Sequence, residues 1–255
     1  MNTEKILSVV IPVYNEGKTI NLILDEVLAR PETAEIIVVD DASKDNSRER
    51  IQKYVDRENG RVRLVCQEKN RGKGAAIRRG FDEAKFPIVI IQDADREYSP
   101  EDYPVIIGPL VSGKADVVYG SRFQGAAGRV LYFKHQLGNK FLTFVSNLLT
   151  DINLTDMETC YKAFRREVIQ NINLDSERFG IEVELTAKFA HARVLKIYEV
   201  PISYNGRTYE EGKKITWKDG VAAMWHMLKY NILQNKSRFY KKPWNEVMKQ
   251  EGILV

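Results

Sequence analysis

The chain has few cysteines and no long apolar run, and each shortage excludes a class of protein. Cys66 and Cys160 are the only cysteines among 255 residues, which excludes a disulfide scaffold and a zinc site built on cysteines. No stretch reaches about 18 uninterrupted apolar residues, so we expect no membrane-spanning helix. The first residues lack a basic segment followed by an apolar one, so we expect no secretory signal and a cytoplasmic protein.

Histidine is also scarce, and its placement excludes hydrolytic chemistry of the serine-protease type. His135, His191 and His226 show neither the spacing of a metal site nor a serine or cysteine nucleophile nearby. The glycine-containing segment 70–74, Asn-Arg-Gly-Lys-Gly, lacks the spacing of a Walker loop. It opens a helical pattern, however, where Lys73 would add positive charge beside a helix N-terminus and favour an anion. The alternative is a strand-to-helix turn with a solvated lysine.

Charge is plentiful but unevenly placed. Charged residues make up 29% and hydrophobic residues 44% of the chain, the balance of a folded, water-soluble protein. The net charge is only +4, yet eight basic residues and one acidic residue lie between Lys213 and Lys242. A basic end favours an anionic partner. Nucleic acid is not the partner we expect, because the segment contains no recognised nucleic-acid-binding module.

Short apolar runs alternate with helical patterns and predict an α/β fold. Leu7–Val13, Ile36–Val39, Val62–Cys66 and Ile88–Ile91 have the composition of buried strands. Helical patterns separate them at 19–29, 47–55 and 75–84. The alternation predicts a mostly parallel sheet with helices on both faces. Each run ends in polar residues, and ligands bind beyond the carboxyl ends of such strands, so we predict a site there.

The second half of the chain predicts further strands at 117–120 and 195–200, with helical patterns at 131–149, 179–191 and 217–239. We predict one α/β domain over residues 1–212 and a basic, aromatic helical appendage over 213–255. The appendage contains five aromatic residues that suit the surface of an anionic membrane, with lysines between them. They are Trp217, Trp225, Phe239, Tyr240 and Trp244. The alternative is a helix packed on the body or in a dimer interface.

Asp93-Ala94-Asp95 follows an apolar strand and carries the strongest chemical signal. Two carboxylates one residue apart on a turn can reach the same hard cation. Oxygen ligands suit Mg²⁺ or Mn²⁺, which would hold a diphosphate, and Glu97 could supply a third oxygen. Asp-x-Asp pairs are most often solvated loop residues. The metal interpretation therefore depends on the position of this pair among other polar strand ends.

Two other charged segments are candidates for the same site. Asp40 and Asp41 end a strand, and two adjacent carboxylates exceed what one helix cap requires. We interpret one of them as a partner of a nucleobase or ribose. Arg207 and Lys213 lie six residues apart in a glycine-containing segment that could close over a diphosphate and neutralise a leaving group. The alternative is a basic surface loop.

Six ordered motifs together resemble family 2 glycosyltransferases with a GT-A fold. Within that family the chain is most similar to the dolichyl-phosphate mannose synthase and polyprenyl-phosphate glycosyltransferase group. The resemblance spans roughly residues 6–230, and its motifs lie at residues 8–16, 39–43, 70–74, 92–95, 120–122 and 207–213. The Q-x-x-R-W motif of processive polysaccharide synthases is absent from the sequence, which disfavours that activity.

The resemblance implies roles for individual residues. Those implied for the nucleoside of the donor are Pro12, Tyr14, Glu16, Val39 and Asp41. The segment Asp93-Ala94-Asp95 would bind the donor diphosphate, with Asp93, Asp95 and Glu97 holding Mg²⁺ or Mn²⁺.

Cationic side chains complete the implied site. Lys73 and Arg122 would contact phosphate, and Arg207 with Lys213 would clamp the diphosphate. Asp95, Arg122, Arg207 and Lys213 are thus the implied catalytic residues. The implied reaction is transfer of a sugar, with inversion, from a GDP- or UDP-linked donor to a polyprenyl phosphate.

The acceptor side departs from the family pattern. Arg129, Lys134 and His135 stand where the mannose synthases carry arginines and a serine, and they are the candidates for binding the acceptor phosphate. A phosphate acceptor is anionic near neutral pH and requires no strong base. A sugar-hydroxyl acceptor would require one, and the candidates are then Asp156, Glu158 and Glu182. A catalytically silent nucleotide-sugar-binding protein is a third interpretation.

Overall fold

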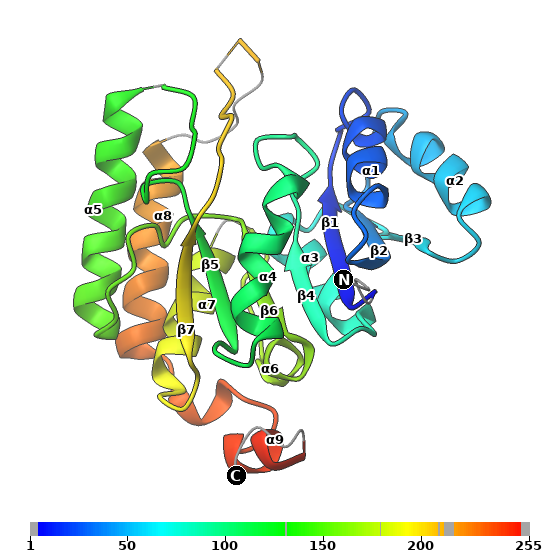
Figure 1. The fold of residues 1–255 in the computed structure, drawn as a ribbon. Coiled ribbons are helices and arrows are strands. Elements are labelled where there is room, and N and C mark those ends of the chain that lie inside the picture. The colour runs from blue at the N-terminus through cyan, green and yellow to red at the C-terminus, as the bar shows by residue number, and fades with distance from the viewer. Residues whose placement is uncertain (1–4, 131, 179, 209, 212–216, 251–255) are drawn as a thin grey trace.

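The structure, a computed structural model, describes residues 5–130, 132–178, 180–208, 210–211 and 217–250. Within these residues seven strands form one sheet in the order β3-β2-β1-β4-β6-β5-β7 (Figure 1). The strands are β1 (Leu7–Val13), β2 (Thr33–Asp40), β3 (Val62–Cys66), β4 (Ile88–Ile91), β5 (Val117–Ser121), β6 (Lys162–Arg165) and β7 (Ile197–Pro201). Only β6 runs antiparallel to its neighbours, so the prediction of a mostly parallel sheet is confirmed.

Alternate residues of each central strand face opposite sides of the sheet and enter two separate cores. On β1, Val9 and Ile11 pack with helices α1 (Ile20–Leu28), α2 (Ser47–Arg57) and α4 (Tyr103–Val111). Val10 faces the other way, toward α3 (Lys73–Glu83), α6 (Arg166–Asn171) and α7 (Ile181–His191). Because both faces are covered, the central strands are apolar throughout, which is why they appear in the sequence as continuous runs.

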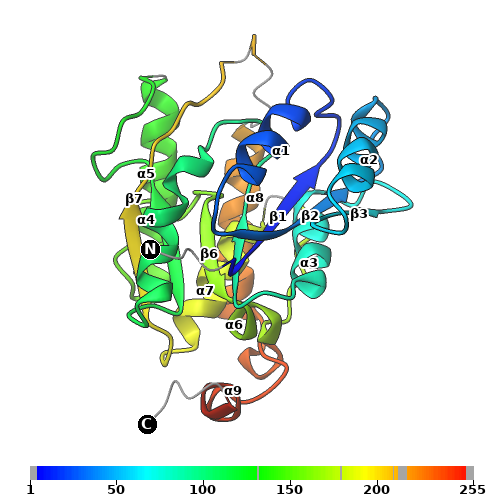
Figure 2. The same ribbon diagram turned by 45° about the vertical axis from the view of Figure 1, so that its right-hand side comes forward.

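Two further helices, α5 (Phe133–Thr150) and α8 (Trp217–Leu228), lie beyond α7 at the edge of the molecule (Figures 1 and 2). They contact α7 and each other. No helix among the described residues is long and apolar enough to cross a membrane.

The C-terminal segment differs from its prediction. The helical pattern over 217–239 predicts one long helix, but α8 continues only through a single π-turn at Lys229–Leu233 and then gives way to extended backbone at Gln234. Phe239 is fully buried, so its expected place at a membrane surface is wrong. Tyr240 donates a hydrogen bond to the carbonyl oxygen of Lys188 over 2.7 Å and stacks edge-on with Trp244, which begins α9 (Trp244–Gln250). Both rings pack partly buried against the core.

Of the five aromatic residues predicted to face a membrane, Trp225 is the one whose described side chain is largely exposed, at 57%. The side chain of Trp217 lies outside the described part of the structure. The division of the chain at residue 212 stays a prediction, because residues 212–216 also lie outside it.

Candidate functional site

The loops after β1, β2 and β4 meet at one edge of the sheet, at the top of Figure 1. Parallel pairing produces this meeting, because it places the carboxyl ends of the strands together. Pro12 on β1 and Val39 on β2 are paired in register, so these two residues predicted to hold the nucleoside lie side by side. Tyr14 and Glu16 follow in the loop after β1, and both are partly exposed.

Asp41 joins the loop after β2 to the loop after β3. Its carboxylate is 2% exposed and accepts hydrogen bonds from the backbone N–H groups of Arg71 and Gly72, over 2.8 and 2.7 Å. Gly72 has a φ of +95°, and an added Cβ would lie 2.5 Å from the carbonyl oxygen of Glu177. Glycine is therefore required at the turn that places Lys73 at the first position of α3.

Lys73 extends from α3 to the acidic turn after β4. Its ammonium lies 2.8 Å from one oxygen of Asp93 and donates a hydrogen bond to the other over 3.0 Å. The ammonium also lies 2.8 Å from the sulfur of Cys160 and 3.7 Å from Glu182. Burial alone would lower the pKa of Lys73, but these three groups hold it well above its usual value.

Arg207 occupies the other side of the same turn. Its guanidinium donates to Asp95 over 2.7 Å and to Glu97 over 3.3 Å, and its backbone N–H donates to Glu97 over 3.0 Å. A second oxygen of Glu97 accepts from the hydroxyl of Tyr204 over 2.9 Å, and Glu16 lies 3.8 Å from the guanidinium. The structure thus brings Arg207 to the Asp-x-Asp turn. Lys213, its predicted companion, lies outside the described residues.

Negative charge exceeds positive charge around Asp95. Burial, together with the charges of Asp93 and Glu97, raises the pKa of Asp95 to about 7, although Arg207 acts to lower it. Ala94 between the two aspartates is buried, so the turn is anchored in the core, and the side chains of Asp93 and Asp95 are only 13% and 16% exposed.

The donor set of this turn fits a divalent cation by its chemistry. Among the described residues no three acidic, histidine or cysteine side chains are arranged to hold a metal ion as they stand. Lys73 and Arg207 form ion pairs with the carboxylate oxygens of the turn. The carboxylates of Glu16, Asp93, Asp95 and Glu97 nonetheless outnumber the two cations that they contact, Lys73 and Arg207. Carboxylate oxygens are the ligands that Mg²⁺ and Mn²⁺ prefer, so Asp93, Asp95 and Glu97 are the residues that would hold such an ion.

Arg122, at the end of β5, is held in a bidentate ion pair with Asp156. The two guanidinium contacts measure 2.7 Å each, the backbone N–H of Arg122 adds a third at 3.0 Å, and the carboxylate is fully buried. The ring of Tyr204 lies 5.2 Å from the guanidinium carbon. Asp156 is thus committed to holding Arg122, which makes it a poor candidate for a general base.

Two carboxylates that the sequence associates only with a hydroxyl acceptor, Glu158 and Glu182, influence each other's charge, and Glu182 lies 3.7 Å from the ammonium of Lys73. Glu182 is 5% exposed, and one buried oxygen of Glu182 and one of Glu158 have no hydrogen-bond partner in the structure. Burial and the charge of Glu182 raise the pKa of Glu158 to about 7. The contact of Cys160 with Lys73 was missed in the sequence, because 87 residues separate the two and no local pattern links them.

The three candidates for the acceptor phosphate lie in different surroundings. Arg129 contacts the segment that carries Arg207, donating to Glu211 over 2.8 Å and to the carbonyl oxygen of Gly206 over 3.2 Å. Lys134 is exposed in the first turn of α5, and the ring of His135 lies 5.4 Å from that of Tyr132. The structure therefore joins Arg129 to the site and leaves Lys134 and His135 on α5 beside it.

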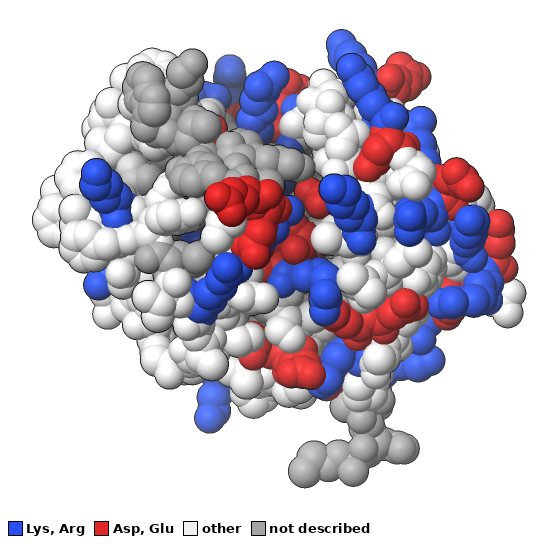
Figure 3. All heavy atoms as spheres, turned by 90° about the horizontal axis from the view of Figure 1, so that it is seen from above, with Lys and Arg blue, Asp and Glu red and all other residues white. Residues whose placement is uncertain are grey.

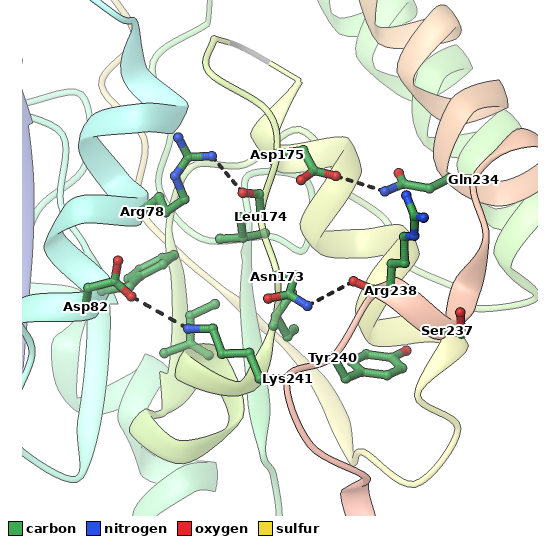
Figure 4. Close-up of a pocket in the computed structure, with 13 residues that line it drawn as sticks. Arg78, Asp82, Asn173, Leu174, Asp175, Gln234, Ser237, Arg238, Tyr240 and Lys241 are labelled. Carbon is green, nitrogen blue, oxygen red and sulfur yellow. Dashed lines mark hydrogen bonds and ion pairs between the residues drawn. The ribbon is translucent and has the colours of Figure 1, made fainter.

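Figure 3 looks down on this edge of the sheet and shows acidic and basic side chains interspersed over its middle. The cavity of about 600 Å³ shown in Figure 4 lies elsewhere, between α3, α6 and the segment after α8. Arg78, Asp175 and Lys241 on its wall are already engaged with Leu174, Gln234 and Asp82. None of the described candidate residues lines it.

Comparison with known proteins gives a consistent result. Residues 8–172 match the family model described as glycosyl transferase family 2. The dolichol-phosphate mannosyltransferase of Pyrococcus furiosus is 31% identical over 216 residues, which cover 81% of this chain and 58% of that protein. The polyprenol monophosphomannose synthase of Mycolicibacterium smegmatis is 29% identical over 206 residues, 78% of this chain and 77% of that protein. The chain thus spans somewhat over half the length of the archaeal relative.

Solved structures of similar fold support the prediction of a GT-A architecture. Glucosyl-3-phosphoglycerate synthase from Mycobacterium tuberculosis, in complex with Mn²⁺, UDP and glucosyl-3-phosphoglycerate, superposes with a TM-score of 0.69 at 20% identity. The match covers 91% of this chain and 81% of that one. The same enzyme has also been solved with Mg²⁺ and UDP, with a TM-score of 0.68. The predicted GT-A fold is confirmed.

Proposed function

The chain belongs to glycosyl transferase family 2, and from this we propose that it transfers a sugar from a GDP- or UDP-linked donor to a polyprenyl phosphate, with inversion at the anomeric carbon. Both relatives named above carry a polyprenol or dolichol phosphate in their names, which supports the acceptor. The undecaprenyl-phosphate 4-deoxy-4-formamido-L-arabinose transferase of Aeromonas hydrophila, 30% identical over 217 residues, supports the same class of acceptor with another sugar.

The observation that carries the proposal is the pairing of two cationic side chains with one acidic turn. Lys73 forms an ion pair with Asp93, and Arg207 forms ion pairs with Asp95 and Glu97. Both cations lie at the edge of the sheet where the parallel strands end. A nucleoside diphosphate leaving the sugar needs fixed positive charge around its phosphates. Lys73 and Arg207 are placed to supply it, and Lys213 would add to it.

A divalent cation held by Asp93, Asp95 and Glu97 would supply further charge to the departing diphosphate. The complexes of the structural neighbour with Mn²⁺ or Mg²⁺ and UDP support this metal requirement. Pro12, Tyr14, Glu16, Val39 and Asp41 would then hold the nucleoside along the ends of β1 and β2.

A phosphate acceptor fits this turn, because such an acceptor needs no general base. Its oxygen is already anionic near neutral pH and can attack the anomeric carbon directly, so what it needs from the protein is positive charge. Arg129 is the acceptor-side cation placed beside the Arg207 segment, and Lys134 and His135 follow on α5. Arg122 would orient the same region through its fixed pair with Asp156.

A hydroxyl acceptor is the second candidate, and one observation favours it. Glu158 and Glu182 each have a buried oxygen without a partner, and the pKa of Glu158 of about 7 suits a group that takes up a proton. The two acceptors differ in what they require, because only the hydroxyl needs such a base.

Release of nucleoside diphosphate tests the proposal. The protein is incubated with Mn²⁺ or Mg²⁺ and a panel of GDP- and UDP-sugars, each with and without a short-chain polyprenyl phosphate. We expect release with one class of donor that rises at least tenfold when the lipid phosphate is present. Release that ignores the lipid phosphate but rises with a sugar acceptor would contradict the proposal and favour the hydroxyl candidate. Metal-dependent nucleotide binding without any release would favour a catalytically silent protein.

A further inference from the structure

Helix α5 is apolar on its inner side and on its outer side. Leu142, Val145 and Leu149 are partly buried and pack against the core. The residues of α5 that are buried are Thr143, Ser146 and Thr150, all small and polar. Five other large apolar side chains of α5 point outward, with exposed fractions between 56% and 73%. They are Phe133, Leu137, Phe141, Phe144 and Leu148. A surface helix of a protein that meets only water has polar residues on its outer side, so this exposed apolar face calls for an apolar partner.

The exposed residues form one narrow stripe. At 3.6 residues per turn they fall within about 80° of the helix surface, and α5 extends for about 27 Å. Helix α8, which contacts α5, has a second stripe with exposed fractions between 42% and 62%. Its residues, including one from the following π-turn, are Val221, Trp225, Leu228 and Ile232. We refer to these nine residues as the two-helix apolar face.

The charges within α5 that flank this face are positive, and the acidic Asp151 follows at the C-terminal end of the helix, 3.8 Å from Arg193. Lys134 and Lys140 flank the stripe of α5, one on each side, and α5 contains no acidic residue. Lys229 follows directly after α8, where Asp219 is the one acidic residue. Figure 3 shows the rim over α5, at its left, as mostly uncharged with isolated basic side chains and no acidic ones.

We propose that the two-helix apolar face docks on the surface of a lipid bilayer that contains anionic headgroups. An apolar stripe flanked by lysines is the arrangement of a helix that lies in the interface plane, with its lysines reaching the headgroups. Trp225 and the exposed ring of Tyr132 have the amphipathic rings that gather at headgroup level. A second copy of the chain is a poorer occupant, because self-association would bring lysines of like charge together.

The two-helix apolar face also lies close to the candidate site. Helix α5 begins four residues after Arg129, whose guanidinium contacts the segment that carries Arg207. A bilayer seated along α5 would therefore lie next to the mouth of the site rather than behind the molecule. This inference does not depend on the proposed acceptor, because membrane binding is measured without donor or acceptor.

Flotation with vesicles tests the proposal. Vesicles of phosphatidylcholine alone are compared with vesicles that also contain phosphatidylglycerol. We expect the protein to float with the anionic vesicles, and the double variant Phe144→Ser, Leu148→Ser to lose at least tenfold in partitioning. The matched control is Val105→Ser, Val111→Ser, which removes exposed apolar side chains from α4 on the other face of the sheet and should float as the unchanged protein does.

The contribution of positive charge to vesicle binding provides a second test. Lys140→Glu should reduce binding to anionic vesicles several-fold and leave the weak binding to neutral vesicles unchanged, and high salt should have the same effect. All variants change exposed side chains, and thermal unfolding confirms that each is folded before it is compared.

Three results would overturn the proposal. They are failure of the unchanged protein to float, flotation of the double variant equal to that of the control, and a dimer in sedimentation that the double variant converts to monomers. The last result would assign the face to a second copy. Nucleoside diphosphate release with a water-soluble short acceptor stays intact in the double variant if only docking is affected, which separates this test from that of the proposed function.

Discussion

The guanidinium of Arg207 donates to the carboxylate of Asp95 over 2.7 Å, although 112 residues separate them in the sequence. This contact brings the segment after β7 onto the turn after β4 and joins the two halves of the sheet at the site. It also means that a cationic side chain and a divalent cation would use the same carboxylate oxygens.

Removing Arg207 is therefore expected to strengthen the binding of Mn²⁺ and to slow the transfer of sugar from the donor. Arg207→Ala frees oxygens of Asp95 and Glu97, so Mn²⁺ should bind several-fold more tightly to the nucleotide-free protein, measured by electron paramagnetic resonance. Sugar transfer should fall by at least a hundredfold, because the leaving diphosphate loses a fixed positive charge. Arg78→Ala, on the wall of the separate cavity, is the control and should leave Mn²⁺ binding unchanged. Weaker Mn²⁺ binding in Arg207→Ala would count against a shared set of oxygens.

Asp95→Ala tests the acidic turn itself. We expect transfer to fall by at least a hundredfold and nucleotide binding to lose its dependence on Mn²⁺, because the central carboxylate of the turn is gone. Isothermal titration with GDP and UDP, with and without chelator, measures the second effect. The exposed Asp56 on α2 gives a matched control as Asp56→Ala. Chelator sensitivity that persists in Asp95→Ala would place the metal elsewhere.

The Arg122–Asp156 pair is expected to contribute to folding as well as to the site. Asp156→Ala leaves the mostly buried guanidinium of Arg122 without its partner, which costs about 3–5 kcal/mol in the free energy of unfolding. The exposed pair of Lys53 with Glu49 is the comparison, since Glu49→Ala should cost less than about 1 kcal/mol. Denaturant titration measures both. If Asp156→Ala and Glu49→Ala lowered the free energy of unfolding by equally small amounts, Asp156 would not hold Arg122 in solution.

Glu158 gives the protein a predictable pH dependence. The fold raises the pKa of Glu158 to about 7, so the folded protein favours the protonated carboxyl. The stability that the protonated carboxyl contributes is fully present at pH values below the pKa of the unfolded chain, and it is lost as the pH rises through about 7. Glu158→Gln does not titrate, so it should be more stable than the unchanged protein at pH 8, on the order of 2 kcal/mol, with little difference near pH 4.5.

Thermal unfolding across this pH range checks the expectation for Glu158. The exposed Glu68, changed to Gln, serves as the control and should show no such trend. A stability difference for Glu158→Gln that stays constant with pH would exclude titration of this carboxyl as its cause.

The strands that the sequence predicts most accurately are those that form continuous apolar runs with sharp polar ends. The bounds of β1, β3 and β4 agree with the predicted runs, because continuous apolar residues ending in polar ones mark such strands clearly. Strand β6 was missed because Lys162–Arg165 has only four residues and a charged residue at each end. Its pairing between β4 and β5, which local sequence does not encode, makes it a strand.

Helices were missed or misjudged for similar reasons. Helix α4 was not predicted, because apolar residues occur on all sides of it and leave no polar face in the sequence pattern. Gly108 and Pro109, which disfavour helices, also lie inside it. Helix α8 ends early because the following chain turns to bury Phe239 beside Lys188, a tertiary contact that periodicity cannot reveal.

The site was predicted in part for a clear physical reason. Parallel strands bring their carboxyl ends together, so charged residues at those ends could be grouped before any contact was known. What the sequence could not supply is which cation meets which carboxylate. Lys73 reaches Cys160 and Asp93, and Arg207 reaches Asp95, only through loops that the fold brings together.

The most direct test of the account is the identity of the sugar acceptor, measured with two lipids that differ only in a phosphate. Short-chain polyprenyl phosphate and the matching polyprenol are each incubated with the donor that supports turnover, and mass spectrometry identifies the product. We predict a sugar joined to the lipid through a phosphodiester, formed with the phosphate, absent with the polyprenol and absent in Asp95→Ala. Equal transfer to the polyprenol, or transfer that needs Glu158 or Glu182 as a base and leaves the lipid phosphate unused, would contradict the account.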